Sequence, residues 1–439
     1  MANFQKIIII QFLFLFCNIN NILPQDTLKL DQAIAIALQN NYSIIIARNN
    51  AEISKNNNTI GNAGLLPGVS VSGTNSKTIY NTRSEDFSEN ITEINSTSTN
   101  ALSANIMLNW TIFDGFEMFI EKDRLSEYQK ISEERLKLEV ENLVSEISSV
   151  YYGIVQQQKR LKILQNAMNF SNKRKELAEA KYRLGSFSEL NYLQAFVDLN
   201  SDSTALIIQL TDLKNSKAEL NNMLARDIQL EYQIVDSITV DSIVSYSELF
   251  ANLEKENTEI GLSKSTIDVA LMSYRLTNSP KYPTINFFAG YNFSRTQYET
   301  GNSKSYQYLG PIIGVNLSYN LFNGFNKRRN TANAKIQIKT GETELRQTIS
   351  NIQTQFFTLY NDYLTNLDLI KFETENIKAA RKTTFVAFER YKLGEISDIE
   401  LRQTQLKELE AENQLLQAQF KAKLLETELL RLSGKLIKD

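Results

Sequence analysis

Tyr182-Arg-Leu-Gly185-Ser-Phe-Ser lies inside a long helical pattern and recurs as Tyr391-Lys-Leu-Gly394-Glu-Ile-Ser, 209 residues later. Phe113-Asp-Gly115-Phe116 recurs at the same offset as Phe322-Asn-Gly324-Phe325. One offset shared by separate landmarks indicates a tandem duplication. We therefore interpret the 439-residue chain as two copies of one unit, each with a helical hairpin that turns at its glycine.

The composition excludes several classes of function. The formal net charge is only −3, so the chain lacks the excess of basic residues that is typical of nucleic-acid binding. The chain contains no histidine and no dinucleotide, Walker or zinc-spaced motif. Carboxylate pairs such as Glu133-Glu134 lie in long helical patterns. On such helices, acidic residues usually face solvent and are not catalytic. The sequence therefore predicts no enzyme: no catalytic residue, no cofactor, no metal and no nucleic-acid partner.

Residues 1–24 have the pattern of a secretory signal peptide. Lys6 is followed by the apolar run 7–16 and then by asparagines. Cys17, the single cysteine, could instead carry a lipid, but Phe16 stands where lipidation requires a small residue. We favour the plain leader, and the mature chain then has no cysteine for a disulfide or for catalysis.

Each repeat contains a pair of strand-like segments. Apolar and polar residues alternate over 102–112, and again over 285–293 and 313–321. These lengths approach the ~9–11 residues with which a tilted strand crosses an outer membrane. Trp110, Tyr319 and Phe322 lie at strand ends, where membrane-interface aromatics occur. A membrane barrel is favoured over a soluble sandwich. We expect the polar stretch 80–100 to be a loop.

Four strands per chain cannot close a barrel with a polar lumen, and open sheet edges are not tolerated in lipid. Closure requires several copies, and three copies would supply about twelve strands, an allowed even number.

Long helices follow the strands, at about 117–183 and 327–392, with apolar steps of three and four residues that indicate a coiled-coil seam. At 1.5 Å per residue each would be roughly 100 Å long. Gly185 and Gly394 end these helices, and Ser188 and Ser397 are predicted to cap the returning helices at 189–224 and 398–432.

Short helices are expected at 28–60 and 247–276, and a side strand at 227–245. The predicted organisation has four successive parts. It comprises a signal peptide (1–24), a first repeat (25–226) with a β-hairpin at 68–112 and a helical hairpin at 116–226 whose tip is 182–188, a connecting β segment (227–245), and a second repeat (246–439) with a β-hairpin at 283–321 and a helical hairpin at 325–434 whose tip is 391–397.

This order resembles the TolC-like outer-membrane efflux family over essentially the whole mature chain. The motifs that carry the resemblance are the two tips, the two Phe-x-Gly-Phe stretches and the closing Leu429-Leu-Arg-Leu-Ser-Gly434. The resemblance implies a mostly helical, internally duplicated homotrimer. Its long antiparallel coiled-coil hairpins would form a periplasmic α-barrel, and four strands per protomer would form a twelve-stranded β-barrel in outer-membrane lipid.

The resemblance also implies a role and partners. Such proteins are passive exit ducts of tripartite efflux pumps or type I secretion systems. They do no chemistry themselves. An inner-membrane pump of the RND or ABC type supplies energy, and a periplasmic adaptor (membrane fusion) protein docks on the helical tips.

By resemblance, the tips carry the functional residues. The adaptor-docking residues would be Tyr182, Arg183, Leu184, Gly185, Ser186, Tyr391, Lys392, Leu393, Gly394 and Glu395. The periplasmic aperture would be lined by residues six and nine places after each tip glycine, which are Glu400, Gln403, Asn191 and Gln194. The family favours acids at both second-copy positions, so Gln403 departs from the pattern.

The sequence is compatible with two alternatives for Glu400 and two for the whole chain. Either three copies of Glu400 form a cation-attracting ring around the channel axis, or Glu400 is an ordinary solvated residue on a helix surface. The alternative for the whole chain is a trimeric coiled-coil adhesin or structural stalk, although each tip glycine reverses the chain and a stalk runs one way. For a duct, we expect the aperture to open by an iris-like loosening of the hairpins.

Overall fold

The computed structural model describes residues 27–240, 245–301 and 303–437. The predicted signal peptide and Cys17 lie outside these residues. The chain separates into two compact units. The sheet unit comprises 47–137 and 258–350, and the helical unit comprises 138–257, 351–439 and the start of the chain up to residue 46, as far as these ranges are described.

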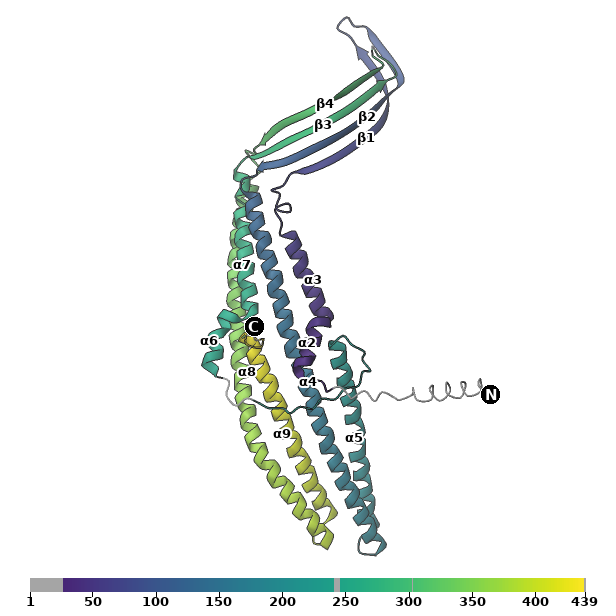
Figure 1. Ribbon diagram of the computed structural model, residues 1–439, viewed down its shortest axis with the longest axis vertical. Coiled ribbons are helices and arrows are strands. Elements are labelled where there is room, and N and C mark those ends of the chain that lie inside the picture. Colours follow the sequence, from purple (N-terminus) through teal and green to yellow (C-terminus); the bar gives the residue numbers. More distant parts are fainter. Residues whose placement is uncertain (1–26, 241–244, 302, 438–439) are drawn as a thin grey trace, which may run out of the picture. The chain divides into compact units, whose positions relative to one another are not determined.

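The sheet unit contains one four-stranded antiparallel sheet in the order β1-β2-β3-β4 (Figure 1). Its strands are β1 (Gly68–Glu85), β2 (Ile91–Phe113), β3 (Thr284–Tyr298) and β4 (Ser305–Ser318). The pairing of β2 with β3 joins the hairpins of the two repeats. β1 and β4 are the two edges of this sheet.

Pairing aligns residues of one kind in rows across the sheet. Val71, Ile106 and Tyr291 lie in one row, and Ser72, Asn105 and Asn292 lie in the next. Because successive side chains point to opposite faces, one face is predominantly apolar and the other predominantly polar. The predicted alternation is confirmed over the paired strands.

Phe288 is the exception to the alternation, and its partner explains how it is accommodated. It pairs with Gly314 on β4. A Cβ atom at Gly314 would lie 2.4 Å from Cζ of the Phe288 ring. The glycine therefore leaves the space that this ring occupies.

Two sequence-based expectations were wrong. Residues 80–100, expected as a loop, mostly extend β1 and β2, and only Asp86–Asn90 turn between them. Cross-strand pairing stabilises these polar residues, although they lack a periodic apolar pattern. The side strand expected at 227–245 is reduced, in the described residues, to one parallel bridge between Gln233 and Thr27.

The helices agree closely with the predicted ranges. The long hairpin helices are α4 (Glu117–Arg183), α5 (Glu189–Met223), α8 (Asn326–Leu393) and α9 (Asp398–Leu432). The shorter helices are α2 (Leu30–Asn40), α3 (Tyr42–Asn57), α6 (Tyr246–Glu256), α7 (Thr258–Leu276) and the one-turn η1 (Ser279–Lys281). Within the described residues, no helix combines the length and the apolar character that a membrane crossing requires.

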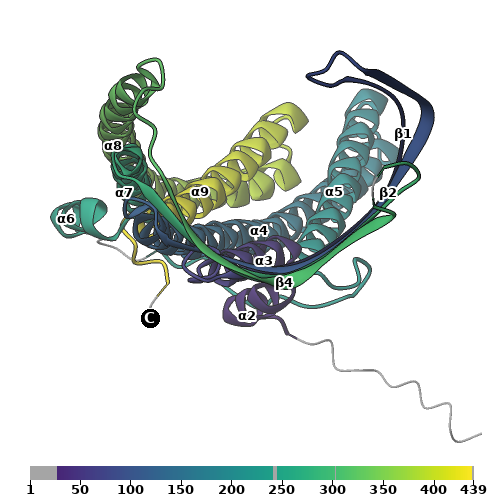
Figure 2. The same cartoon turned by 90° about the horizontal axis from the view of Figure 1, so that it is seen from above.

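In the helical unit, α5, α4, α9 and α8 lie side by side in that order (Figure 2). Side-chain hydrogen bonds join each neighbouring pair: Gln157 to Ser216, Ser145 to Glu428, and Arg381 to Glu412. Equivalent seam positions of the two repeats are buried, as Ile147 and Phe356 are, and also Ile154 and Tyr363. These pairs support the predicted coiled-coil seam.

The duplication extends to backbone conformation. Gly115 and Phe116 both have positive φ, and so do Gly324 and Phe325, 209 residues later. At the start of the following helix, Asp114 accepts a hydrogen bond from the Met118 amide, and Asn323 accepts one from the Lys327 amide. Each Phe-x-Gly-Phe motif therefore makes the same strand-to-helix turn.

Candidate functional site at the helical tips

Both hairpins turn by the same mechanism. Gly185 and Gly394 have φ of +75° and +80°, which a residue with a Cβ adopts at a cost. The Ser186 amide donates to the Lys181 carbonyl, and the Glu395 amide to the Arg390 carbonyl. This bonding satisfies carbonyls at the helix end, as in a Schellman motif. Ser188 and Ser397 then cap α5 and α9, as predicted.

The predicted docking residues are mostly exposed. Leu184 and Leu393, which precede the two tip glycines, are 81% and 75% exposed. Tyr182 is also exposed and stacks on Tyr192 at 6.1 Å. Arg183, Gly185, Ser186, Lys392, Gly394 and Glu395 are exposed too. Two equivalent leucines at the tips are an apolar surface that nothing in the described chain covers.

Tyr391 does not fit the docking prediction, because its side chain is 0% exposed. Its ring packs near Phe187 of the other hairpin, with centroids 5.6 Å apart. Lys181 donates to the Tyr391 carbonyl at 2.8 Å and lies over both rings. Burial raises the pKa of the Tyr391 hydroxyl well above its ordinary value, so this tyrosine stays neutral. Tyr391 joins the two hairpins instead.

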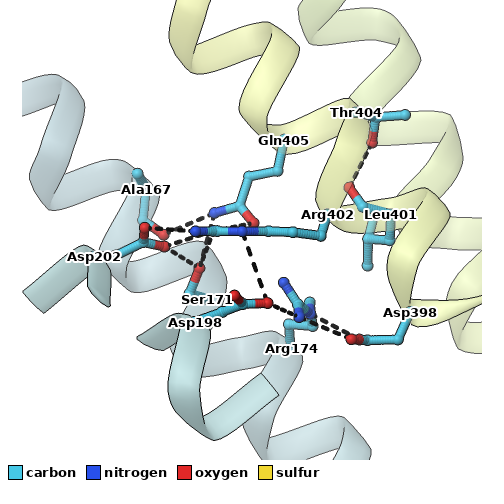
Figure 3. Close-up of polar contacts among 10 residues, drawn as sticks. All are labelled: Ala167, Ser171, Arg174, Asp198, Asp202, Asp398, Leu401, Arg402, Thr404 and Gln405. Atoms are coloured by element: carbon cyan, nitrogen blue, oxygen red, sulfur yellow. Dashed lines mark hydrogen bonds and ion pairs between the residues drawn. The ribbon is translucent and has the colours of Figure 1, made fainter. Parts of the chain in front are cut away.

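A buried arginine strengthens this connection. Arg174 of α4 is 0% exposed and donates through Nε and Nη2 to the two Asp398 oxygens of α9, at 2.7 and 2.8 Å (Figure 3). Its Nη2 also donates to Asp198 of α5. Burial by itself would lower the pKa of Arg174, but these hydrogen bonds outweigh it and raise the pKa. The guanidinium therefore stays charged.

A second arginine, on α9, connects the same two hairpins from the other side. Arg402 of α9 donates through Nη1 and Nη2 to the two Asp202 oxygens of α5, at 2.8 and 2.9 Å. Ser171 donates to Asp202, and Gln405 donates to Ser171 and to the Ala167 carbonyl. We call Arg174, Asp198, Asp202, Asp398, Arg402, Gln405 and Ser171 the inter-hairpin network; Figure 3 shows how these side chains converge.

Sequence reasoning missed this network. Arg174 and Asp202 correspond to Thr383 and Ala411 in the other repeat, so a search guided by the duplication passes over them. A signal did exist in the spacing. Asp398, Arg402 and Gln405 are spaced by four and three residues, which places these polar groups on one helix face. Only the packing of α9 against α4 and α5 identifies that face as buried.

Glu400, the predicted aperture acid, has a defined local role. Its carboxylate accepts hydrogen bonds from the Ser397 amide at 2.8 Å and the Ser397 hydroxyl at 3.1 Å, and Ser397 accepts from the Glu400 amide. This is a capping box. The hydrogen bonds from Ser397 lower the pKa of Glu400, and nearby Arg390 contributes. The side chain is exposed.

The other aperture positions are uncharged. The Asn191 amide donates to Ser188 at 3.4 Å, at the place in α5 that Glu400 has in α9. Gln194 and Gln403 are exposed on the first turns of these helices. All four positions therefore lie close behind the tips, and the aperture role stays a prediction.

The predicted interface aromatics lie in the sheet unit. Trp110 of β2 is partly exposed and donates from Nε1 to the Leu65 carbonyl at 2.9 Å. Tyr319 and Phe322 are exposed just past the end of β4, and Lys327 lies over the Tyr319 ring at 5.3 Å. In the residues described, no group of three His, Cys, Asp or Glu side chains has an arrangement that could hold a metal ion.

Comparison with known proteins identifies the family. The sequence model of the outer membrane efflux protein family matches residues 33–226 and 249–435, once on each repeat. The chain belongs to this family. It is therefore an outer-membrane efflux channel that extends into the periplasm, and the adhesin and soluble-sandwich alternatives no longer apply. A search of curated protein sequences found no match.

Solved structures share the fold of this family member. The Campylobacter jejuni CmeC outer membrane channel is 16% identical, with a TM-score of 0.77 over 93% of this chain and 86% of its own. VceC from Vibrio cholerae is 14% identical, with a TM-score of 0.75 over 92% and 96%. The outer-membrane channel OprN is 15% identical, with a TM-score of 0.75 over 92% and 89%.

Proposed function

We propose that three copies of this chain form one passive duct, the exit part of a tripartite efflux pump or a type I secretion system. The observation that carries the proposal is the four-stranded sheet with one polar face and two open edges, β1 and β4. An open edge in lipid leaves backbone groups without partners, so neighbouring copies must pair with it. Three sheets would close about twelve strands around a polar lumen.

The exposed tips suit a partner on the periplasmic side. Leu184 and Leu393 present apolar surface beside Arg183 and Lys392. An apolar centre with a charged rim is the usual composition of a protein interface. We assign this surface to a periplasmic adaptor, which would connect the duct to an inner-membrane pump of the RND or ABC type.

The inter-hairpin network supports a gate at the same end. Removing one partner of a buried ion pair costs about 3–5 kcal/mol, so such pairs resist separation. Arg174–Asp398 and Arg402–Asp202 both connect the first hairpin to the second. An iris-like loosening between the hairpins would have to break them. The network would thus hold the duct closed until a partner compensates for the lost contacts.

Planar-bilayer recording of the purified protein tests the proposal. We expect small, cation-selective single-channel conductance, and larger conductance when Asp398→Asn weakens the network. The matched control is Glu375→Gln, which removes an exposed acid paired with Lys378 on α8. A correctly assembled protein without pore activity would contradict the duct. Pores whose conductance is equal in all three proteins would contradict the gate alone.

A further inference from the structure

The far end of the β1–β2 hairpin extends beyond the rest of the sheet. β2 pairs with β3 only from Thr99 onward, while β1 and β2 continue to their own turn at Asp86–Asn90. We call residues 82–95 the distal hairpin. The other hairpin turns earlier, between Tyr298 and Ser305. The β-hairpins of the two repeats therefore differ in length at this end of the sheet.

A bulge bends the hairpin where it leaves the sheet. The pairing shifts between Tyr80 and Thr82, because Tyr80 faces Thr97 whereas Thr82 faces Ile94. This leaves one extra residue on β2, and such bulges bend and twist a strand. Ser96 adopts φ +57°, and the Asn81 side chain accepts a hydrogen bond from its amide at 2.7 Å. A side-chain contact thus stabilises an unfavourable backbone conformation.

The turn between β3 and β4 braces the base of the bend. Thr97 is buried, and its hydroxyl lies 2.7 Å from that of Thr300. The Ser98 amide donates to the Glu299 carboxylate at 2.9 Å, and the Glu299 amide donates to the Ser98 carbonyl. The sheet is therefore fixed up to Thr97, and the distal hairpin begins directly after this brace.

The distal hairpin itself is held by contacts within it. Asp86 accepts hydrogen bonds from the Ser88 and Asn90 amides, and Arg83 pairs with Glu93 across the strands. At the turn, the Phe87 side chain is fully exposed. Viewed from above, the sheet is an arc, and the β1–β2 turn bends toward the inside of that arc (Figure 2).

We propose that the distal hairpin is a flap over the cell-surface mouth of the channel, hinged at the bulge, with the same hairpin of neighbouring copies as its partner. This rests on the proposed trimeric duct. In a barrel closed from three such arcs, an inward bend directs each turn toward the axis. Phe87 of one copy would then contact Phe87 of its neighbours, which removes the exposed rings from water.

Conductance of three hairpin variants tests the flap. In one, an Asn-Gly turn replaces residues 82–95. In the others, Ser96 is changed to Val or to Gly. Valine disfavours positive φ, so Ser96→Val should lose the bend. Glycine permits positive φ, so Ser96→Gly should keep it. All three are recorded in the Asp398→Asn background, because closed tips in series with the flap would otherwise limit the current. There we expect the shortened hairpin and Ser96→Val to raise single-channel conductance, and Ser96→Gly to leave it unchanged. If Ser96→Val assembles and conducts as Ser96→Gly does, the flap is refuted, even where the shortened protein fails to fold.

Crosslinking tests the partner. In a protein with Cys17 changed to Ser, Phe87→Cys should give disulfide-linked copies on mild oxidation, and Tyr306→Cys, exposed on edge strand β4, should give none. Absence of the Phe87→Cys crosslink in a conducting channel would refute the contact between flaps. A wild-type protein that forms no pore would instead refute the duct, so the two failures are distinguishable.

Discussion

At the scale of single residues, burial distinguishes the arginine of the inter-hairpin network from the exposed charges of the helices. Arg174 has no exposed surface, and Asp398 faces it through two hydrogen bonds. Exposed pairs such as Lys378–Glu375 typically contribute only ~0–1 kcal/mol, because water competes for both charges. The energetic cost of breaking an ion pair therefore depends on how deeply the pair is buried.

Asp398→Asn should loosen the tips. An uncompensated buried charge costs about 3–5 kcal/mol, and we expect the lower end because Asp198 still faces Arg174. Hydrogen exchange of the amides in 387–401 should become faster, while Glu375→Gln should leave exchange in this segment unchanged. Equal exchange in the two variants would show that the network does not stabilise the tips.

Glu400 combines a cap and a charge, and two substitutions separate them. Glu400→Gln retains an acceptor for the Ser397 amide, whereas Glu400→Ala loses it. If Glu400 lines the aperture, both variants should reduce cation selectivity, measured from reversal potentials, and only Glu400→Ala should speed hydrogen exchange at the start of α9. Unchanged selectivity in both would leave Glu400 as a cap alone.

The pH dependence of Glu400 follows from its lowered pKa. A carboxylate with a lowered folded-state pKa stabilises the protein fully above its unfolded pKa, about 4.3, and this contribution is lost as pH falls through the folded pKa. Glu400 is therefore still charged at pH 5. If it lines the aperture, cation selectivity should persist at pH 5 and decline in more acidic solution. Reversal potentials of the wild type and Glu400→Gln across this range check the prediction, since the variant should show no such decline.

At the scale of elements, glycines allow close packing between strands. A Cβ atom at Gly314 would overlap the Phe288 ring. Gly314→Ala should destabilise the protein, since overpacking typically costs ~1–3 kcal/mol. Phe288→Leu should partly rescue it, because the two sites are in contact. The melting temperature of the sheet in detergent, followed by circular dichroism, measures this; additive effects of the two substitutions would argue against the overlap.

The two helical hairpins are the elements that the proposed gate would separate. A disulfide between cysteines placed beside Glu400 and Asn191, in a protein with Cys17 changed to Ser, should abolish the conductance gain of Asp398→Asn. Reduction of the same sample is the control, since it should restore the gain. A locked channel that still shows the gain would contradict opening between hairpins.

At the scale of the whole molecule, the open edges of the sheet require other copies. Because β1 and β4 are edge strands, we expect a trimer, with about three times the mass of the mature chain, in native mass spectrometry from detergent. A folded monomer would contradict the proposed closure.

Much of this protein was determined by the sequence alone. The 209-residue offset, the alternating strands and the tip glycines predicted the four strands, the four long helices and both turns, because these features depend on local periodicity and backbone preference. The offset also led to the family. Periodicity did not reveal the extension of β1 and β2 through 80–100, since cross-strand pairing forms it.

The tertiary structure alone decided which polar residues are buried. Arg174, Asp398 and Asp202 read as ordinary helix-surface charges until α9 packs against α4 and α5. Tyr391 is buried although its repeat partner Tyr182 is exposed, because each contacts different neighbours. Burial and pairing depend on residues some 200 positions apart, and a local pattern carries no information on such contacts.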